Sequence, residues 1–163
     1  GQHWQNGMAE VAIMDEGIGV LNSLQKNRIH RQYIDNDEAA LRACVKAGIS
    51  QAFNPAVKAR TDSEWSNSGY GLYVVSKLCS VLGGSFCIAS GKKYLHIDDN
   101  GKVKIGDTYI RGTAVKITMN ASGLSNADAL IQQIAKEGQE QAKMIRNAFK
   151  SASTPSKGLI DHI

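Results

Sequence analysis

The sequence lacks several features that would restrict its class. Of its 163 residues only two are proline, and 6% are aromatic. No uninterrupted apolar run approaches 18 residues, so no transmembrane helix is predicted. No signal-peptide pattern opens the chain. Basic residues outnumber acidic ones by 19 to 15, but they are scattered and form no block. We therefore expect a cytoplasmic protein that has neither a membrane nor a nucleic acid as its partner.

Cysteine and histidine are also too sparse for a metal or disulfide framework. The three cysteines, Cys44, Cys79 and Cys87, form no C-x-x-C pair, and the four histidines lie far apart in the sequence. An odd count without a motif indicates reduced thiols in a reducing compartment. We predict no metal site built from protein ligands alone.

What the chain does contain is an ordinary globular composition with clear hydrophobic periodicity. Apolar residues make up 42% and charged residues 21%, enough for one domain with a core. Helices are predicted over residues 20–31, 37–47, 72–82 and 125–149. A strand buried on both faces is predicted over residues 8–14. Shorter antiparallel strands are predicted over residues 85–90, 93–97, 103–105 and 109–119.

This order of elements indicates an α+β fold, with helices on one face of a mixed, mostly antiparallel sheet. Residues 50–68 show neither the helical nor the alternating strand pattern of apolar residues, and they are predicted to form a long loop. We divide the chain into a domain of residues 1–122, a C-terminal helix within residues 123–150 and a flexible tail of residues 151–163. The apolar stripe of that helix is expected to pack on the domain. The alternative is a contact between two copies in a homodimer.

The first motif is Asp-x-Gly-x-Gly, formed by Asp15, Gly17 and Gly19 at the end of the first predicted strand. A buried acid needs a partner, and the amino group of a ligand would be one. Glycines have no Cβ, so a flat ring could lie against the backbone beside them. The alternative is a tight turn whose aspartate caps the next helix.

The second motif is Gly69-Tyr70-Gly71, directly before a helix with an apolar face. Free N–H groups and the helix dipole favour phosphate binding at such a start. The alternative is a flexible hinge into the helix. The spacing fits neither a dinucleotide-binding motif nor a P-loop. Further on, Gly112 and Thr113 open a β-branched stretch, which is ordinary strand sequence when taken alone.

Taken together and in this order, the three segments resemble the GHKL ATPases, the superfamily of histidine kinases, gyrase B, heat-shock protein 90 and the mismatch-repair ATPases. MDEGIG resembles the adenine-binding box, SGYGLYVVSKLCSVLGGSFCIAS the glycine box with its helix and following strand, and GTAVKI the terminal Gly-Thr strand. The resemblance covers residues 8–119 and is closest to bacterial stand-alone ATP-binding proteins. It implies the Bergerat ATP-binding fold, a two-layer α/β sandwich.

The resemblance also implies roles for individual residues at the base of the nucleotide. Asp15 would accept a hydrogen bond from the adenine amino group, and Thr113 would share this network directly or through water. Gly17 and Gly19 would line the base pocket.

At the other end of the nucleotide, the resemblance implies that the start of the helix holds the phosphates, through Gly69, Tyr70, Gly71 and Leu72. Residues 50–68 would form the ATP lid. Lys58 and Arg60 could reach phosphate from this lid, or they could be solvated surface charges.

The sequence departs from the family in three places. Only fourteen residues precede Asp15, too few for the helix that carries the magnesium ligand and, in some members, a general base. We therefore expect the N-terminal part to be truncated, and Mg²⁺ to bind only if an upstream helix is supplied; the catalytic residues stay unknown. Tyr73 replaces a glycine and could crowd the phosphates or face the core. Glu16 could face solvent or repel phosphate.

The function implied by the resemblance is an ATP- or ADP-binding domain of a histidine-kinase-like protein. Nucleotide-dependent lid closure would signal to a protein partner or a neighbouring domain. Two alternatives stay open. The chain could be the catalytic domain of a histidine or serine protein kinase, or a degenerate member of the superfamily that serves as an interaction module.

Overall fold

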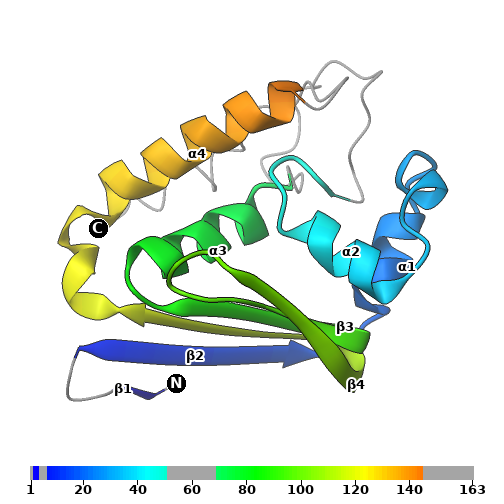
Figure 1. Ribbon diagram of the computed structural model, residues 1–163, viewed down its shortest axis with the longest axis horizontal. Coiled ribbons are helices and arrows are strands. Elements are labelled where there is room, and N and C mark those ends of the chain that lie inside the picture. The colour runs from blue at the N-terminus through cyan, green and yellow to red at the C-terminus, as the bar shows by residue number, and fades with distance from the viewer. Residues whose placement is uncertain (1, 4–6, 51–68, 145–163) are drawn as a thin grey trace.

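One antiparallel sheet organises the chain in the computed structural model, which describes residues 2–3, 7–50 and 69–144 (Figure 1). Its strands are β1 (Gln2–His3), β2 (Met8–Asp15), β3 (Ser85–Ile97) and β4 (Val103–Asn120), in the spatial order β1-β2-β4-β3. All three pairings of this sheet are antiparallel. The α+β class is thus confirmed, but among the described strands the sheet is antiparallel throughout, where a mixed sheet was predicted.

The helices lie on one side of the sheet (Figure 1). The α-helices are α1 (Gly19–Gln25), α2 (Asp37–Cys44), α3 (Gly71–Val81) and α4 (Ala127–Met144), and two short 3₁₀ segments are η1 (His30–Gln32) and η2 (Ala121–Asn126). The first predicted helix is shorter than expected and does not continue to residue 31. The side chain of Asn27 accepts a hydrogen bond from the Ile29 amide, a local bond that competes with helix formation.

The β3–β4 hairpin is longer and more regular than predicted. Four short strands were expected, but two long ones form, with an irregularity in register around Gly91. Gly91 has a φ of 63°, and a Cβ there would lie 2.5 Å from the Asp37 carboxylate. The same carboxylate accepts a hydrogen bond from the Lys92 amide at 2.9 Å. The bulge therefore lets β3 continue past the start of α2 instead of ending there.

The sequence Asp98-Asp99-Asn100-Gly101 predicts a hairpin turn with a two-residue Asn-Gly loop, and the turn forms at this place but with a different type of loop. The Asp98 amide donates to the Lys102 carbonyl at 3.1 Å, so the loop has three residues, Asp99 to Gly101, rather than two. Gly101 has a φ of 75°. A turn closed by a glycine in the left-handed region is the usual form of a three-residue hairpin loop.

Strand β2 is not buried on both faces, contrary to the prediction. Ile13 is 68% exposed, Met14 64% and Val11 40%. Val11 and Ile13 lie opposite Ile117 and Val115 of β4 in the register, and these two β4 residues pack against the core. Helices α1, α2 and α3 contact β3 or β4, and the apolar side chains of β2 are left accessible. An apolar run alone therefore did not predict burial.

The sequence Asp35-x-x-Glu38 resembles a capping box, which predicts Asp35 as the cap of the second helix, and this prediction is wrong by one residue. Asn36, and not Asp35, is the N-cap of α2, and its side-chain oxygen accepts from the Ala39 amide at 2.9 Å. Asp35 instead accepts a hydrogen bond from the Asn36 amide group. Asn36 adopts an extended backbone, as an N-cap requires, before the helix begins at Asp37.

This assignment leads to a prediction for two neighbouring alanine variants. Asn36→Ala should lower the free energy of unfolding by about 1 kcal/mol, because it leaves the Ala39 amide without its cap. Asp35→Ala should change it by less than about 0.5 kcal/mol. Urea denaturation followed by circular dichroism measures both. A larger loss from Asp35→Ala than from Asn36→Ala would return the cap to Asp35.

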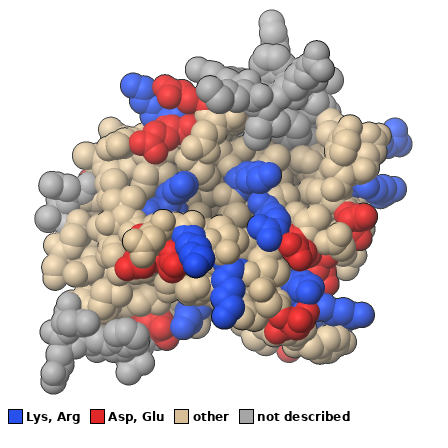
Figure 2. Space-filling view, in the orientation of Figure 1, with Lys and Arg blue, Asp and Glu red and all other residues tan. Residues whose placement is uncertain are grey.

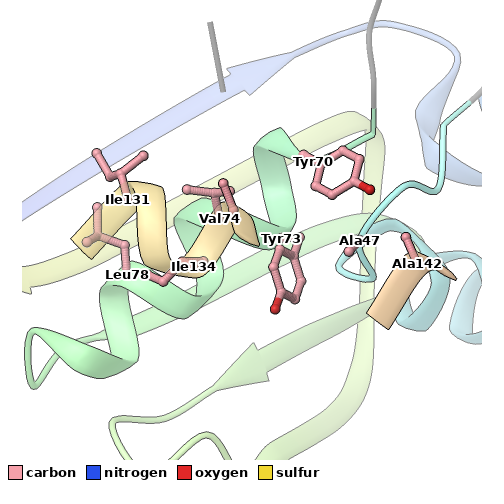
Figure 3. Packing of buried hydrophobic residues seen from close by; sticks show 9 residues of the cluster. Ala47, Tyr70, Tyr73, Val74, Leu78, Ile131, Ile134 and Ala142 are labelled. Atoms are coloured by element: carbon pink, nitrogen blue, oxygen red, sulfur yellow. The ribbon is translucent and has the colours of Figure 1, made fainter. Parts of the chain in front are cut away.

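Two hydrophobic clusters form the core. The larger joins α1, α2 and α3 to the sheet around Leu41, Phe86 and Ile88, all fully buried. The second joins α3 to α4 through residues such as Val74 and Ile134 (Figure 3). The stripe of the last helix thus packs on the domain itself within the described residues. Its expected members at positions 145 and 149 lie outside them.

A buried histidine holds the chain where the predicted lid begins. The His30 Nε2 lies 3.0 Å from the Ser50 carbonyl oxygen. Burial lowers the pKa of His30, and the bond to Ser50 opposes this effect. The neutral ring is therefore favoured, and Nε2 carries the proton because a carbonyl only accepts. Residues 51–68, where the lid with Lys58 and Arg60 was predicted, lie outside the described residues.

Candidate nucleotide site

The end of β2 brings two of the predicted site residues together. In the β2–β4 register Asp15 lies directly opposite Thr113, and in the β3–β4 register Thr113 lies opposite Ser90. Directly opposed residues project from the same face of a sheet. Asp15, Thr113 and Ser90 therefore form one row across three strands. Asp15 is exposed, Thr113 half-buried and Ser90 buried.

The Asp15 carboxylate shapes the turn that follows. Its Oδ1 accepts a hydrogen bond from the Gly17 amide at 2.7 Å, which is the geometry of an Asx turn. Helix α1 has Ile18 as its N-cap and no side-chain cap. The alternative of a helix-capping aspartate is therefore wrong, whereas the tight turn is present. An ionised carboxylate has about four acceptor positions, so one bond to Gly17 leaves capacity for a ligand donor.

Ser90 fastens this turn to the sheet, a role that the sequence analysis did not assign. Its hydroxyl donates to the Gly112 carbonyl at 2.7 Å and accepts from the Val20 amide at 3.0 Å. One side chain of β3 thus contacts β4 at Gly112 and the first turn of α1 at Val20. The available signal was a small polar residue ending the apolar stretch SFCIAS.

Two of the glycines are required by close approach of the backbone. Gly19 has a φ of 77°, and a Cβ there would lie 2.8 Å from the Ser90 hydroxyl oxygen. Gly112 has a φ of 87°, and a Cβ would overlap the Asp15 carbonyl oxygen. Both conformations are strained for residues with a side chain. Gly17 differs, since a Cβ there would approach only the Asp15 carboxylate.

The second glycine motif forms the start of α3 as predicted. Gly69 has a φ of 78°, and its carbonyl accepts from the Gly48 amide at 3.2 Å. A Cβ on Gly69 would lie 2.5 Å from the Ile49 carbonyl oxygen, so packing alone requires this glycine. Gly71 is exposed, and a Cβ there would meet no atom of the described residues within 4 Å. None of the described residues therefore closes the helix start at Gly71 to a ligand.

The aromatic residues at this helix start face inward. Tyr70 is fully buried, so it can offer a ligand only its backbone, whereas the sequence analysis included the whole residue in the phosphate site. Tyr73 is 2% exposed and belongs to the core. Of the two alternatives for Tyr73, crowding the phosphates or facing the core, the second is therefore correct. Leu72 is half-buried and packs against the larger cluster.

The two halves of the predicted site lie at the same end of the molecule. In Figure 1, β2 ends and α3 begins toward the right-hand side, the side on which α1 and α2 also lie. Helix α1, which follows the Asp15 turn, contacts α2, and the residues after α2 contact Gly69. The arrangement can present the Asp15 carboxylate to one part of a ligand and the N–H groups at the start of α3 to another.

Neither a metal cluster nor a membrane-spanning helix is found in the described part of the chain. No group of three or more His, Cys, Asp or Glu side chains there could hold a metal ion. No described helix is long and apolar enough to cross a bilayer.

Comparison with known proteins adds no relative. No protein-family model matches the chain, and no curated protein matches it.

Proposed function

We propose that this chain binds ATP at the end of β2 and the start of α3, as the ATP-binding part of a GHKL-type protein with a Bergerat fold. The observation that carries the proposal is the pairing of Asp15 with Thr113 across β2 and β4. These residues come from the first and last of the three motifs, and the resemblance requires both at the adenine. The register of the sheet makes them neighbours.

The chemistry of the turn after β2, at Asp15 and Gly17, supports adenine as the base. The amino group of adenine is a donor, and the exposed Asp15 carboxylate is an acceptor whose Oδ1 is oriented by Gly17. The missing Cβ of Gly17 leaves backbone surface beside that carboxylate. A planar ring can lie against such a surface.

The start of α3 supports a phosphate-bearing ligand. The helix is 11 residues long, its N-cap Tyr70 makes no side-chain cap, and its first turn contains no acidic residue. Its N-terminal amides and dipole therefore favour an anion. The open space at Gly71 would admit one. We propose that nucleotide binding acts on a partner protein or neighbouring domain through α1 and α3, the helices that begin at the site.

Calorimetry on the intact chain tests the proposal by comparing ATP with GTP, with and without Mg²⁺. The 6-oxo group of guanine accepts hydrogen bonds, so it cannot donate to Asp15. A lost hydrogen bond to a charged group costs about 1.5–3 kcal/mol, which corresponds to roughly 10- to 100-fold in affinity. ATP and ADP should therefore bind at least about tenfold more tightly than GTP. Absence of ATP binding, or equal affinities, would contradict the proposal.

A further inference from the structure

A cavity of about 410 Å³ lies away from the proposed nucleotide site. It is open on one side and is lined by α3, by the turn of the β3–β4 hairpin, by the residues after α2 and by Gln141 near the end of α4. None of the residues proposed to hold nucleotide lines it. Its volume is in the range of pockets that bind small molecules.

A buried hydroxyl group lies in its wall. The Tyr73 side chain lines the cavity, and its buried hydroxyl makes no hydrogen bond of standard geometry. The Gln141 side chain, which lines the same cavity, interacts with this hydroxyl and opposes the rise in the pKa of Tyr73 that burial causes. Figure 3 shows the ring extending from α3 with the hydroxyl at its far end, away from Tyr70 and Val74. Buried polar groups nearly always have a partner, and leaving one unpaired is costly. A ligand with an acceptor atom would satisfy this group.

The Tyr73 ring is held in this position by α4. A Cβ on Gly138 would lie 2.6 Å from the ring, so the helix passes close to its face or edge only because residue 138 is glycine. This packing keeps the hydroxyl at the cavity wall rather than in solvent. The position is therefore a consequence of the α3–α4 contact and does not depend on a flexible side chain.

The charges at the cavity favour an anion. Lys46 and Lys77 line it, against one acidic lining residue, Asp99, and the charge of Glu137, which raises the pKa of Tyr73 from outside the lining. The neighbouring Asp98 carboxylate is already engaged by the amides of Asn100 and Lys102. Figure 2 shows Lys and Arg side chains gathered in the middle of this face, with acidic groups around them.

The remaining wall is partly apolar. Four apolar residues contribute to it from the ends of four elements, α2, α3, β3 and β4: Val45, Val81, Ile97 and Val103. The Ser76 and Ser80 hydroxyls donate to the carbonyls of Tyr73 and Asp98, so their protons are used within the protein. The wall thus offers a ligand the Tyr73 hydroxyl, the two lysines and the side-chain amides of Asn100 and Gln141 as donors, beside apolar surface.

We propose that this cavity binds a small carboxylate with an apolar body. The carboxylate accepts one hydrogen bond from the Tyr73 hydroxyl and is attracted by Lys46 and Lys77. The apolar body lies against the valines and Ile97. This site is independent of the proposed nucleotide site, and its test needs no nucleotide.

Benzoate is a suitable probe, with neutral benzamide and cationic benzylammonium as matched controls. In ¹H–¹⁵N NMR titrations of the full chain, benzoate should shift the amides of Ser76, Lys77, Asn100 and Val103 saturably. Benzamide should bind several-fold more weakly, and benzylammonium more weakly still. No saturable shift with benzoate, or equal binding of benzamide, would overturn the proposal.

Two sets of variants test the donors separately. Tyr73→Phe should weaken benzoate binding roughly 10- to 100-fold, the usual contribution of one hydrogen bond to a charged group, without lowering the thermal midpoint. The double variant Lys46→Gln/Lys77→Gln should weaken it several-fold at low salt, while Lys104→Gln, outside the cavity, should not. Unchanged affinity in both the tyrosine and the double-lysine variants would overturn the proposal. If Tyr73→Phe unfolded, the lysine pair would decide alone.

Discussion

Replacing Asp15 with asparagine is expected to weaken ATP binding roughly 10- to 100-fold while the fold is retained. The asparagine side-chain oxygen can still accept the hydrogen bond that Gly17 donates to Asp15 Oδ1, so the turn after β2 should persist. The other carboxylate oxygen, however, is replaced by an NH₂ group, which is a donor. It would then face the adenine amino group, which is also a donor, and the charge that strengthens the native bond would be lost.

Calorimetric titration with ATP measures this effect, and Glu16→Gln is the matched control. Glu16 is the next residue along the chain, is also exposed and carries the same charge. Its neutralisation should leave ATP affinity unchanged or raise it slightly, because a negative charge near the phosphates is removed. Equal losses of ATP affinity in the two variants would mean that removing one negative charge, and not one specific hydrogen bond, explains the result. Unchanged affinity of Asp15→Asn would remove the adenine-binding role of Asp15.

Replacing Gly112 with alanine is expected to lower the free energy of unfolding by several kcal/mol, about 3–5. Gly112 has a φ of 87°, and the added Cβ would overlap the Asp15 carbonyl oxygen. Relief requires β4 to move away from β2 at the residue before Thr113. The Gly112 carbonyl also accepts the Ser90 hydroxyl bond, so the same movement would loosen β3 and α1.

Gly101→Ala separates the effect of the clash from the effect of backbone strain. Gly101 has a φ of 75°, similar to that of Gly112, but a Cβ there would meet no atom within 4 Å. Its replacement should therefore cost only the strain of the left-handed conformation, about 1–2 kcal/mol. Guanidinium denaturation of both variants gives the comparison. If the two losses were equal, close packing of Gly112 on Asp15 would not contribute to stability.

The local elements could largely be predicted from the sequence. Helix α3 begins at Gly71, one residue from the predicted start, and the turn at residues 98–101 lies where Asn100 and Gly101 indicated it. These features depend on neighbouring residues and on helical or alternating periodicity, which are properties of short segments. The boundary errors also have local causes, such as the competition of Asn27 with the first helix and the choice of Asn36 as a cap.

Part of the candidate site could be predicted in the same way, since its glycines mark turns and helix starts. The roles of Ser90 and Gly112 could not, because each depends on which residue of another strand lies opposite. Ser90 contacts Gly112 and Val20, which are distant from it in sequence. The cavity beside Tyr73 is likewise formed by four separate segments of the chain.

By itself, then, the sequence determined the α+β class, the approximate helices and strands, and the positions where the backbone needs glycine. Only the tertiary structure decided that Asp15 and Thr113 are neighbours, that apolar β2 is exposed, and that the buried Tyr73 hydroxyl lies in a cavity wall. The physical reason is that periodicity and turn preferences act over a few residues. Burial, strand register and cavities depend on which distant segment packs against each residue.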